Sequence, residues 1–127
     1  MADTQGDADA AVLVTGAAGF IGYFVAERLL QAGRRVVGID NLNDYYDPAL
    51  KEARLDRLRQ HPGFAFERLD IADRAGVETL FRRHSPRIVT HLAAQAGVGY
   101  SITNPHAYGE SNLTGFLHIL EGCRSVG

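Results

Sequence analysis

The sequence contains little of several residue types that mark particular classes of protein. Among its 127 residues there is a single cysteine, Cys123, so no disulfide can form within the chain, which fits a reducing compartment such as the cytosol. Lys and Arg number 13 against 15 Asp and Glu, and this net charge of −2 gives no reason to expect binding to nucleic acid or to an anionic membrane. No apolar run approaches the roughly 20 residues of a membrane span. We therefore expect a cytoplasmic protein that contacts neither nucleic acid nor membrane.

A metal site and a signal peptide are also not expected. Four histidines have no cysteine or carboxylate partner at a spacing typical of metal ligands: His84, His91, His106 and His118. Residues 1–10 carry three aspartates among small side chains and lack the basic and apolar regions of a signal peptide. We expect these ten residues to form a short disordered tail, and residues 11–127 to form one modest domain, since 46% of the chain is hydrophobic.

What the sequence does contain is a glycine-rich turn that joins a short apolar run to a helix. The run Val12-Leu13-Val14 precedes it, and the glycines are Gly16, Gly19 and Gly22. A backbone that approaches a pyrophosphate closely cannot carry Cβ atoms at the contact points. A helix beginning near Gly19 would also direct free N–H groups and its positive dipole end at the phosphates. Such turns also occur where no ligand binds, so the glycines alone leave both interpretations open.

The residues that follow favour a dinucleotide. Apolar side chains at helical spacing predict that 20–32 form a helix with one buried face: Phe20, Ile21, Phe24, Val25, Leu29 and Leu30. A second buried strand is predicted at 35–40 and ends in Asp40. A carboxylate about 20 residues after the glycines is placed to accept hydrogen bonds from the adenosine ribose. Its charge would repel a 2′-phosphate, which favours NAD over NADP, although an ordinary strand-end role for Asp40 is the alternative.

The rest of the chain continues the alternation of strand and helix. We expect helices at 48–60, 73–84 and 105–124, with Asp73 as the N-cap of the second, and strands between them at 64–69 and 87–92. Right-handed βαβ units then predict a parallel sheet of order 3-2-1-4 with helices on both faces, an α/β fold that is part of a Rossmann fold. Ligands of such folds bind at the carboxyl ends of the strands. Four candidate residues fall there: Gly16, Asp40, Asp70 and Ala93.

Several segments together resemble the extended short-chain dehydrogenases/reductases, and within them the NAD-dependent epimerase/dehydratase family. The patterns that carry the resemblance are Thr15-Gly16-x-x-Gly19-Phe20-Ile21-Gly22 and His91-Leu92-Ala93-Ala94. Residues 40–47, 91–98 and 100–123 are similar to those of the UDP-glucuronate 4-epimerase branch. The resemblance extends from Val12 to Cys123.

The resemblance implies four groups of residues that bind NAD. One would hold the pyrophosphate: Gly16, Gly19, Phe20, Ile21 and Gly22. A second would contact the adenosine ribose and its surroundings: Asp40, Asn41 and Asn43. A third would border the adenine: Asp70 and Ile71. The fourth would line the path to the nicotinamide ribose: Leu92, Ala93, Ala94 and Gln95. The substrate would be a nucleotide sugar.

Simpler roles compete for two polar residues. Asp70 also fits a strand-end residue that caps the next helix. The resemblance makes Asn112 a structural asparagine that steadies a neighbouring backbone turn, and a half-buried helix residue with a local hydrogen bond is the alternative.

The resemblance also implies catalysis by a Tyr-x-x-x-Lys, in which tyrosine removes the proton of a sugar hydroxyl while hydride passes to NAD and returns to the other face of the sugar. None of the five tyrosines stands four residues before a lysine. We therefore assign no catalytic residue. Because the chain ends where a fifth strand is expected and family members are more than twice as long, we expect a truncated or split product without a substrate domain, inactive alone. Its partner would be a second copy or a complementing C-terminal half.

Two other interpretations stay open. Gly99 stands where the glucuronate epimerases commonly have an arginine, whose guanidinium would pair with an anionic sugar nucleotide. A sugar-nucleotide dehydratase or decarboxylase, which would share the same N-terminal part, is the second interpretation. A non-catalytic NAD-binding module is the third interpretation. In each case we expect the fourth strand to be left as an unpaired sheet edge, which favours association of the isolated chain.

Overall fold

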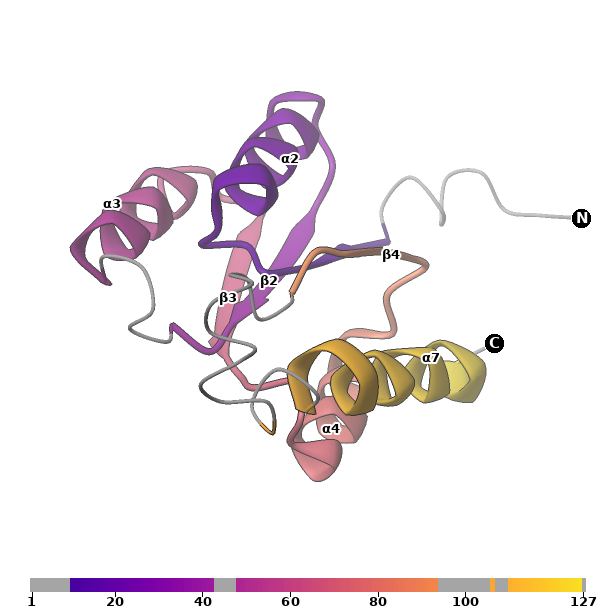
Figure 1. The fold of residues 1–127 in the computed structure, drawn as a ribbon. Coiled ribbons are helices and arrows are strands. Elements are labelled where there is room, and N and C mark those ends of the chain that lie inside the picture. Colours follow the sequence, from indigo (N-terminus) through magenta and orange to yellow (C-terminus); the bar gives the residue numbers. More distant parts are fainter. Residues whose placement is uncertain (1–9, 43–47, 94–105, 107–109, 127) are drawn as a thin grey trace, which may run out of the picture.

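A four-stranded parallel sheet forms the centre of the molecule (Figure 1). The structure is a computed structural model that describes residues 10–42, 48–93, 106 and 110–126. The strands are β1 (Val12–Thr15), β2 (Val36–Asp40), β3 (Phe64–Arg68) and β4 (Ile88–His91). They lie in the order β3-β2-β1-β4, which confirms the predicted order and the Rossmann-like topology. β4 pairs with β1 alone, so it is an edge strand within the described part of the chain.

Helices cover both faces of this sheet. They are α2 (Phe20–Gln31), α3 (Pro48–Leu58), α4 (Arg74–His84) and α7 (Gly115–Val126), the last preceded by a π-helical turn, η1 (Glu110–Thr114). Figure 1 shows α2 and α3 on one side of the sheet and α4 and α7 on the other. The helix expected over 105–124 is therefore described from residue 110 and continues to residue 126. The predicted start of this helix at residue 105 lies outside the described residues. Of the predicted tail, only Ala10 is described.

Each face of the sheet has its own apolar core. Val12, Val14 and Val36 point to the face covered by α2 and α3, where they pack with Leu55 and Leu58. The intervening strand residues point to the opposite face and pack under α4 and α7: Leu13, Val37 and Ile39 with Val77, Leu80, Phe81 and Ile119. Because successive side chains of a strand alternate between faces, the central strands β1 and β2 are buried on both. Val77, Leu80 and Phe81 thus form the inner face of α4.

The predicted buried face of α2 is wrong in part. Phe20, Ile21 and Phe24 are 67%, 61% and 51% exposed, whereas Gly22 and Ala26 are buried. The reason is the close approach of this helix to the turn before it. A Cβ on Gly22 would lie 2.0 Å from the carbonyl oxygen of Gly16, so the small residues must face the sheet. The large apolar residues at the start of the helix are consequently turned outward.

The start of α4 agrees with the prediction. Asp73 is the N-cap, and its side chain accepts a hydrogen bond from the backbone N–H of Gly76 (3.1 Å). This bond satisfies one of the N–H groups that have no partner within the helix. Among the described residues, no helix has both the length and the apolar character needed to cross a membrane.

The register of β1 brings the ends of three strands to the same edge of the sheet. Thr15, the last residue of β1, is level with Ile39 of β2 and with His91 of β4. Asp40 follows Ile39 directly and ends β2. The glycine turn after β1 therefore lies between the end of β2 and the end of β4, where the sequence predicts the ligand crevice.

Candidate functional site

The turn between β1 and α2 has, at its first position, a backbone conformation that residues other than glycine rarely adopt. Gly16 has φ +73°, and a Cβ there would lie 3.0 Å from the backbone of Leu92 and Ala93. The N–H groups of Gly16 and Ala17 both donate to the carbonyl oxygen of Ile39 (2.8 and 3.1 Å). The turn is thus held between β2 and the segment after β4.

The N-terminus of α2 is open at this turn. Its N-cap, Gly19, has an extended backbone and no side chain with which to cap the helix, and the first turn contains no acidic residue. The first N–H groups of a helix have no partner within it, and the helix dipole makes this end positive. Phe20 and Ile21 supply two of these N–H groups. This arrangement is suited to an anion such as a phosphate.

Asp40 is buried beside the turn and tied to it. Its side chain is 7% exposed; Oδ2 accepts a hydrogen bond from the N–H of Ala18 (3.1 Å) and Oδ1 accepts one from the N–H of Leu42 (2.8 Å). The ammonium group of Lys51 lies 3.7 Å from Oδ1. A carboxylate offers about four lone-pair sites, so capacity remains for hydroxyl groups of a ligand. The sequence reasoning did not identify Lys51, whose charge offsets that of Asp40.

A second cation of α3 reaches the same turn from one helical turn further on. Arg54 donates a hydrogen bond from Nη1 to the carbonyl oxygen of Ala18 (2.9 Å), and its guanidinium carbon lies 6.0 Å from the centre of the Phe20 ring. Two contacts therefore link the glycine turn to α3 through Ala18. Its N–H binds Asp40, which pairs with Lys51 of α3, and its carbonyl oxygen binds Arg54 of α3.

The hydroxyl of Thr15 joins the glycine turn to the end of β4. Its Oγ1 accepts hydrogen bonds from the N–H groups of Leu92 (2.9 Å) and Ala93 (3.0 Å) and lies 2.8 Å from Nδ1 of His91. A hydroxyl has one hydrogen and two acceptor positions, and both acceptor positions are taken. The hydroxyl must therefore donate to Nδ1, which leaves the proton of the neutral imidazole on Nε2. Burial lowers the pKa of His91, which also favours the neutral ring.

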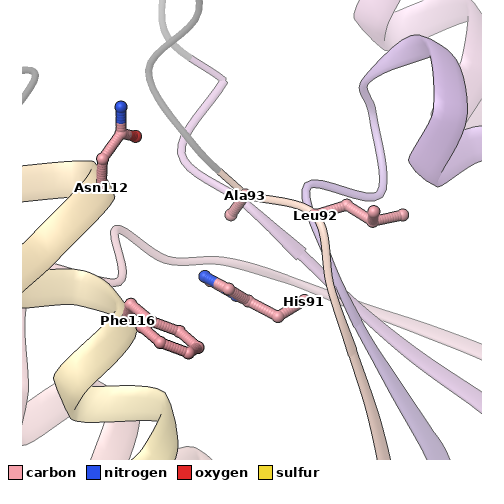
Figure 2. A pocket seen from close by; sticks show the side chains of 5 residues that line it. All are labelled: His91, Leu92, Ala93, Asn112 and Phe116. Atoms are coloured by element: carbon pink, nitrogen blue, oxygen red, sulfur yellow. The ribbon is translucent and has the colours of Figure 1, made fainter.

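A pocket of about 360 Å³ opens beside this histidine. Figure 2 shows the residues that line it, which come from the end of β4 and from the helical segment opposite: His91, Leu92, Ala93, Asn112 and Phe116. The rings of His91 and Phe116 are stacked, with their centres 5.3 Å apart and an angle of 20° between their planes. The backbone of Ala93, one of the lining residues, lies beside Gly16 of the glycine turn. Thr15 and Phe116 were not singled out from the sequence.

The remaining predicted residues are distributed unevenly. Asn41 is half-buried directly after Asp40. Asp70 is exposed after β3, and its Oδ1 accepts a hydrogen bond from the N–H of Ala72 (2.9 Å), a local turn bond, whereas the cap of α4 is Asp73. The side chain of Ile71 is 4% exposed and packs in the core under α7. Three predicted residues lie outside the described part of the chain: Asn43, Ala94 and Gln95.

Metal-binding side chains do not gather in the described ranges. No group of three or more His, Cys, Asp or Glu residues there is arranged to hold a metal ion. The chemistry on offer at this edge of the sheet is instead an open helix N-terminus, a buried carboxylate with an ammonium group beside it, and an apolar pocket with a fixed imidazole.

Comparison with known proteins places this arrangement in a family. Residues 13–127 match the family described as GDP-mannose 4,6 dehydratase. An uncharacterized 37.6 kDa protein of Escherichia coli is 61% identical over 112 residues, which cover 88% of this chain and 33% of that protein. The UDP-glucuronate 4-epimerase of Thermodesulfobacterium geofontis is 48% identical over 115 residues, covering 91% of this chain and 36% of the epimerase.

The fold is likewise shared with solved structures. The UDP-glucuronic acid 4-epimerase of Bacillus cereus, in complex with UDP-glucuronic acid and NAD, superimposes with a TM-score of 0.81 at 34% identity, over 90% of this chain and 36% of that one. The chain thus spans about a third of the length of the relatives it matches. By sequence and by fold, this chain belongs to the GDP-mannose 4,6 dehydratase family, among the NAD-dependent epimerases and dehydratases of the extended short-chain dehydrogenases/reductases.

Proposed function

We propose that this chain is the NAD-binding portion of a nucleotide-sugar 4-epimerase of the type that interconverts UDP-glucuronate and UDP-galacturonate. One observation carries the proposal: the glycine turn and the carboxylate of Asp40 lie at the same sheet edge, joined by the hydrogen bond from Ala18 to Asp40 (3.1 Å). The relatives named as UDP-glucuronate 4-epimerases, and the Bacillus cereus epimerase with NAD bound, support the choice of cofactor and substrate.

The described residues of the glycine turn and the buried Asp40 carboxylate support an NAD site at this sheet edge. The turn and the open end of α2 would hold the pyrophosphate through Gly16, Gly19, Phe20, Ile21 and Gly22, because their backbone leaves room for it and the dipole favours it. Asp40, Asn41 and Asn43 would bind the adenosine ribose. Asp70 and Ile71 would border the adenine, and Leu92, Ala93, Ala94 and Gln95 would lead to the nicotinamide ribose. NAD, when bound, supplies a hydride acceptor that can return the hydride to the sugar.

The pocket at the end of β4 would serve the nicotinamide side. Leu92, Ala93 and Phe116 give it an apolar lining that suits the flat face of a nicotinamide ring. The Thr15 hydroxyl keeps Nδ1 of His91 occupied, so Nε2–H is the donor that this ring offers. We assign no proton-transfer step, since the sequence contains no Tyr-x-x-x-Lys, and we propose that the chain by itself does not epimerise its substrate.

Calorimetric titration of the purified chain with NAD tests the cofactor site. We expect saturable 1:1 binding, and an affinity reduced about tenfold or more by Asp40→Asn, because hydrogen bonds to a charged acceptor contribute about 1.5–3 kcal/mol. Asparagine keeps the size of Asp40 and one acceptor, which limits damage to the turn. Asp56→Asn is the matched control, since that carboxylate lies on the surface of α3 with 72% of its side chain exposed. Absence of NAD binding to the unsubstituted chain would overturn the proposal.

An epimerisation assay tests the proposed inactivity. The chain alone, incubated with UDP-glucuronate and NAD, should form no UDP-galacturonate above background. Turnover would contradict this part of the proposal while leaving the cofactor site intact.

A dehydratase is the second candidate, because the matching family is described as GDP-mannose 4,6 dehydratase. A non-catalytic NAD-binding module is the third. Reading the genomic DNA beyond codon 127 distinguishes the enzyme portion from the module. A continuation with a Ser-x-x-x-Tyr-x-x-x-Lys-like pattern, in frame or shifted, is expected for an enzyme portion, and its absence would favour the module.

A further inference from the structure

A hydrogen bond from a half-buried histidine joins α7 to the segment between β3 and α4. Nδ1 of His118 lies 2.8 Å from the carbonyl oxygen of Ile71. Because a carbonyl oxygen only accepts, the hydrogen of this bond is on Nδ1. Ile71 is 4% exposed, and within the described part of the chain no backbone N–H donates to its carbonyl oxygen. His118 therefore satisfies a buried acceptor that has no backbone partner there.

Asp70 holds the same peptide group at its other end. The C=O of Ile71 and the N–H of Ala72 belong to one planar peptide unit. This N–H donates to Oδ1 of Asp70 (2.9 Å). Rotation of the peptide unit would break both bonds together. The bond from His118 thus fixes the direction of the Ala72 N–H, and through it the position of the Asp70 carboxylate.

The segment is placed between a packed helix and the proposed cofactor site. On the side of α7, a Cβ on Gly115, one helical turn before His118, would lie 2.4 Å from the side chain of Ile71. On the other side, the N–H of Leu69 donates to the carbonyl oxygen of Asp40 (3.1 Å) at the end of β2. His118 therefore reaches the segment from a rigid element, which is what precise positioning of a site requires.

We propose that His118 is a positioning residue of the adenine side of the NAD site, acting on Asp70 through the peptide group between residues 71 and 72. Because Oδ1 of Asp70 is held by Ala72, the exposed carboxylate offers Oδ2 to a hydrogen-bond donor of the ligand, such as the exocyclic amino group of adenine. This inference rests on the proposed NAD-binding function, in which Asp70 borders the adenine. We assign His118 no contact with the ligand.

Comparison of NAD with nicotinamide hypoxanthine dinucleotide tests this role, because hypoxanthine carries a carbonyl oxygen in place of the amino group. We would measure both dissociation constants by calorimetry for the unsubstituted chain, His118→Leu and His118→Asn. The preference for NAD should fall about fivefold or more in His118→Leu, a part of what a hydrogen bond to a charged acceptor contributes. His118→Asn should retain the preference, because its amide nitrogen, like Nδ1, is attached to Cγ and donates.

Two further variants separate positioning from general damage. In Asp70→Ala the preference for NAD should already be low, and adding His118→Leu should not lower it further. His84→Leu is the matched control, since His84 ends α4 and contacts Glu67 instead of the segment before the helix. A purely structural role of His118 would weaken the binding of both dinucleotides equally. Circular dichroism melting checks that each variant is folded.

A measurement on the unsubstituted chain keeps the inference falsifiable if His118→Leu does not fold. Nitrogen NMR of the histidine rings, well above the pH at which they are charged, should show the proton of His118 on Nδ1. The spectrum of His118→Asn identifies the signal. A proton on Nε2 instead would overturn the proposal.

The outcomes separate the two proposals. If the unsubstituted chain binds no NAD, the proposed function is overturned. If it binds NAD but the preference for NAD is unchanged in His118→Leu, or falls as far in His118→Asn, the role of His118 is overturned and the NAD site stands.

Discussion

The hydroxyl of Thr15 connects two segments that are 76 residues apart in the sequence. It accepts hydrogen bonds from the N–H groups of Leu92 and Ala93 and donates one to Nδ1 of His91. Thr15 itself is fully buried, at 0% exposure. One side-chain oxygen therefore sets both the course of the chain after β4 and the tautomer of the histidine in the pocket.

Substitution of Thr15 by valine should destabilise the protein strongly, although the two side chains have nearly the same shape. Valine removes the side-chain acceptor of both N–H groups; the N–H of Leu92 keeps the backbone carbonyl oxygen of residue 15 (3.2 Å), whereas the N–H of Ala93 loses its acceptor. An unsatisfied buried donor costs about 1–3 kcal/mol. We expect urea unfolding to show a free energy of unfolding lower by about 2 kcal/mol or more. Thr15→Ser keeps the hydroxyl and should lose less. Equal losses in the two variants would show that the hydroxyl is not what matters.

The neutral state of His91 predicts a pH dependence of stability. Because burial lowers its pKa in the folded protein, the unfolded chain binds the proton more readily, and the free energy of unfolding should fall as the pH decreases through about 6.5. Chemical denaturation between pH 8 and pH 5 measures this fall. His91→Asn, which offers Thr15 an acceptor that does not titrate, should show a smaller fall. An identical pH profile in the variant would contradict the assignment.

At the scale of elements, glycines decide how closely α7 approaches its neighbours. A Cβ on Gly122 would lie 2.4 Å from the ring of Phe81 on α4, and one on Gly115 would lie 2.4 Å from the side chain of Ile71. His118 adds a hydrogen-bond contact between its Nδ1 and the carbonyl oxygen of Ile71 (2.8 Å). The packing of α7 on α4 and on Ile71 thus depends on two positions where a side chain is absent.

Substitution of Gly122 by alanine should destabilise the protein although alanine favours helix. Inserting a methyl group against Phe81 costs about 1–3 kcal/mol, which exceeds the gain in helix propensity of up to about 1 kcal/mol. We expect a lower melting temperature in calorimetry. Combining it with Phe81→Leu should give a smaller loss than the sum of the two single losses, since the shorter side chain makes room. Additive losses would mean that the two residues do not compete for space.

At the scale of the whole molecule, an exposed apolar surface lies on one side of the helical segment at the C-terminal end of the described residues. Leu113, Phe116, Leu117 and Leu120 are between 44% and 74% exposed and recur at the i, i+3, i+4, i+7 spacing of a single helix face. β4, the edge strand beside it, carries a 48% exposed Ile88. A surface of this kind in contact with water favours association.

The isolated chain should therefore self-associate as its concentration rises. Sedimentation velocity is expected to show an increasing weight-average mass, and Leu117→Lys should shift the distribution toward monomer, because it places a charge in the centre of the exposed face. Leu50→Lys is the matched control, with a leucine 48% exposed on α3. If the two variants sediment alike, the α7 face is not where the copies meet.

Much of the fold follows from local patterns that the sequence alone carries. Apolar runs and helical spacing predicted the strands β1 to β4, the helices α2, α3, α4 and α7, and the sheet order, because strand and helix periods depend on neighbouring residues and crossovers are right-handed. The π-helical turn η1 was not predicted. Gly16 and Asp73 were also predictable. A positive φ favours glycine, and the unpaired N–H groups at a helix N-terminus favour a capping side chain such as that of aspartate. Asp40 was placed at the correct strand end by its spacing from the glycines.

Only the tertiary structure decided which side chains are buried and what they contact. It turned Gly22 of α2 toward the sheet and Phe20 outward, buried Lys51 against Asp40, and joined Thr15 to His91. The physical reason is the same in each case: these contacts depend on how the elements pack against one another, at distances that no local pattern encodes. The sequence by itself determined the elements and the glycine turn, and the packing of the sheet determined the charge and hydrogen bonding around that turn.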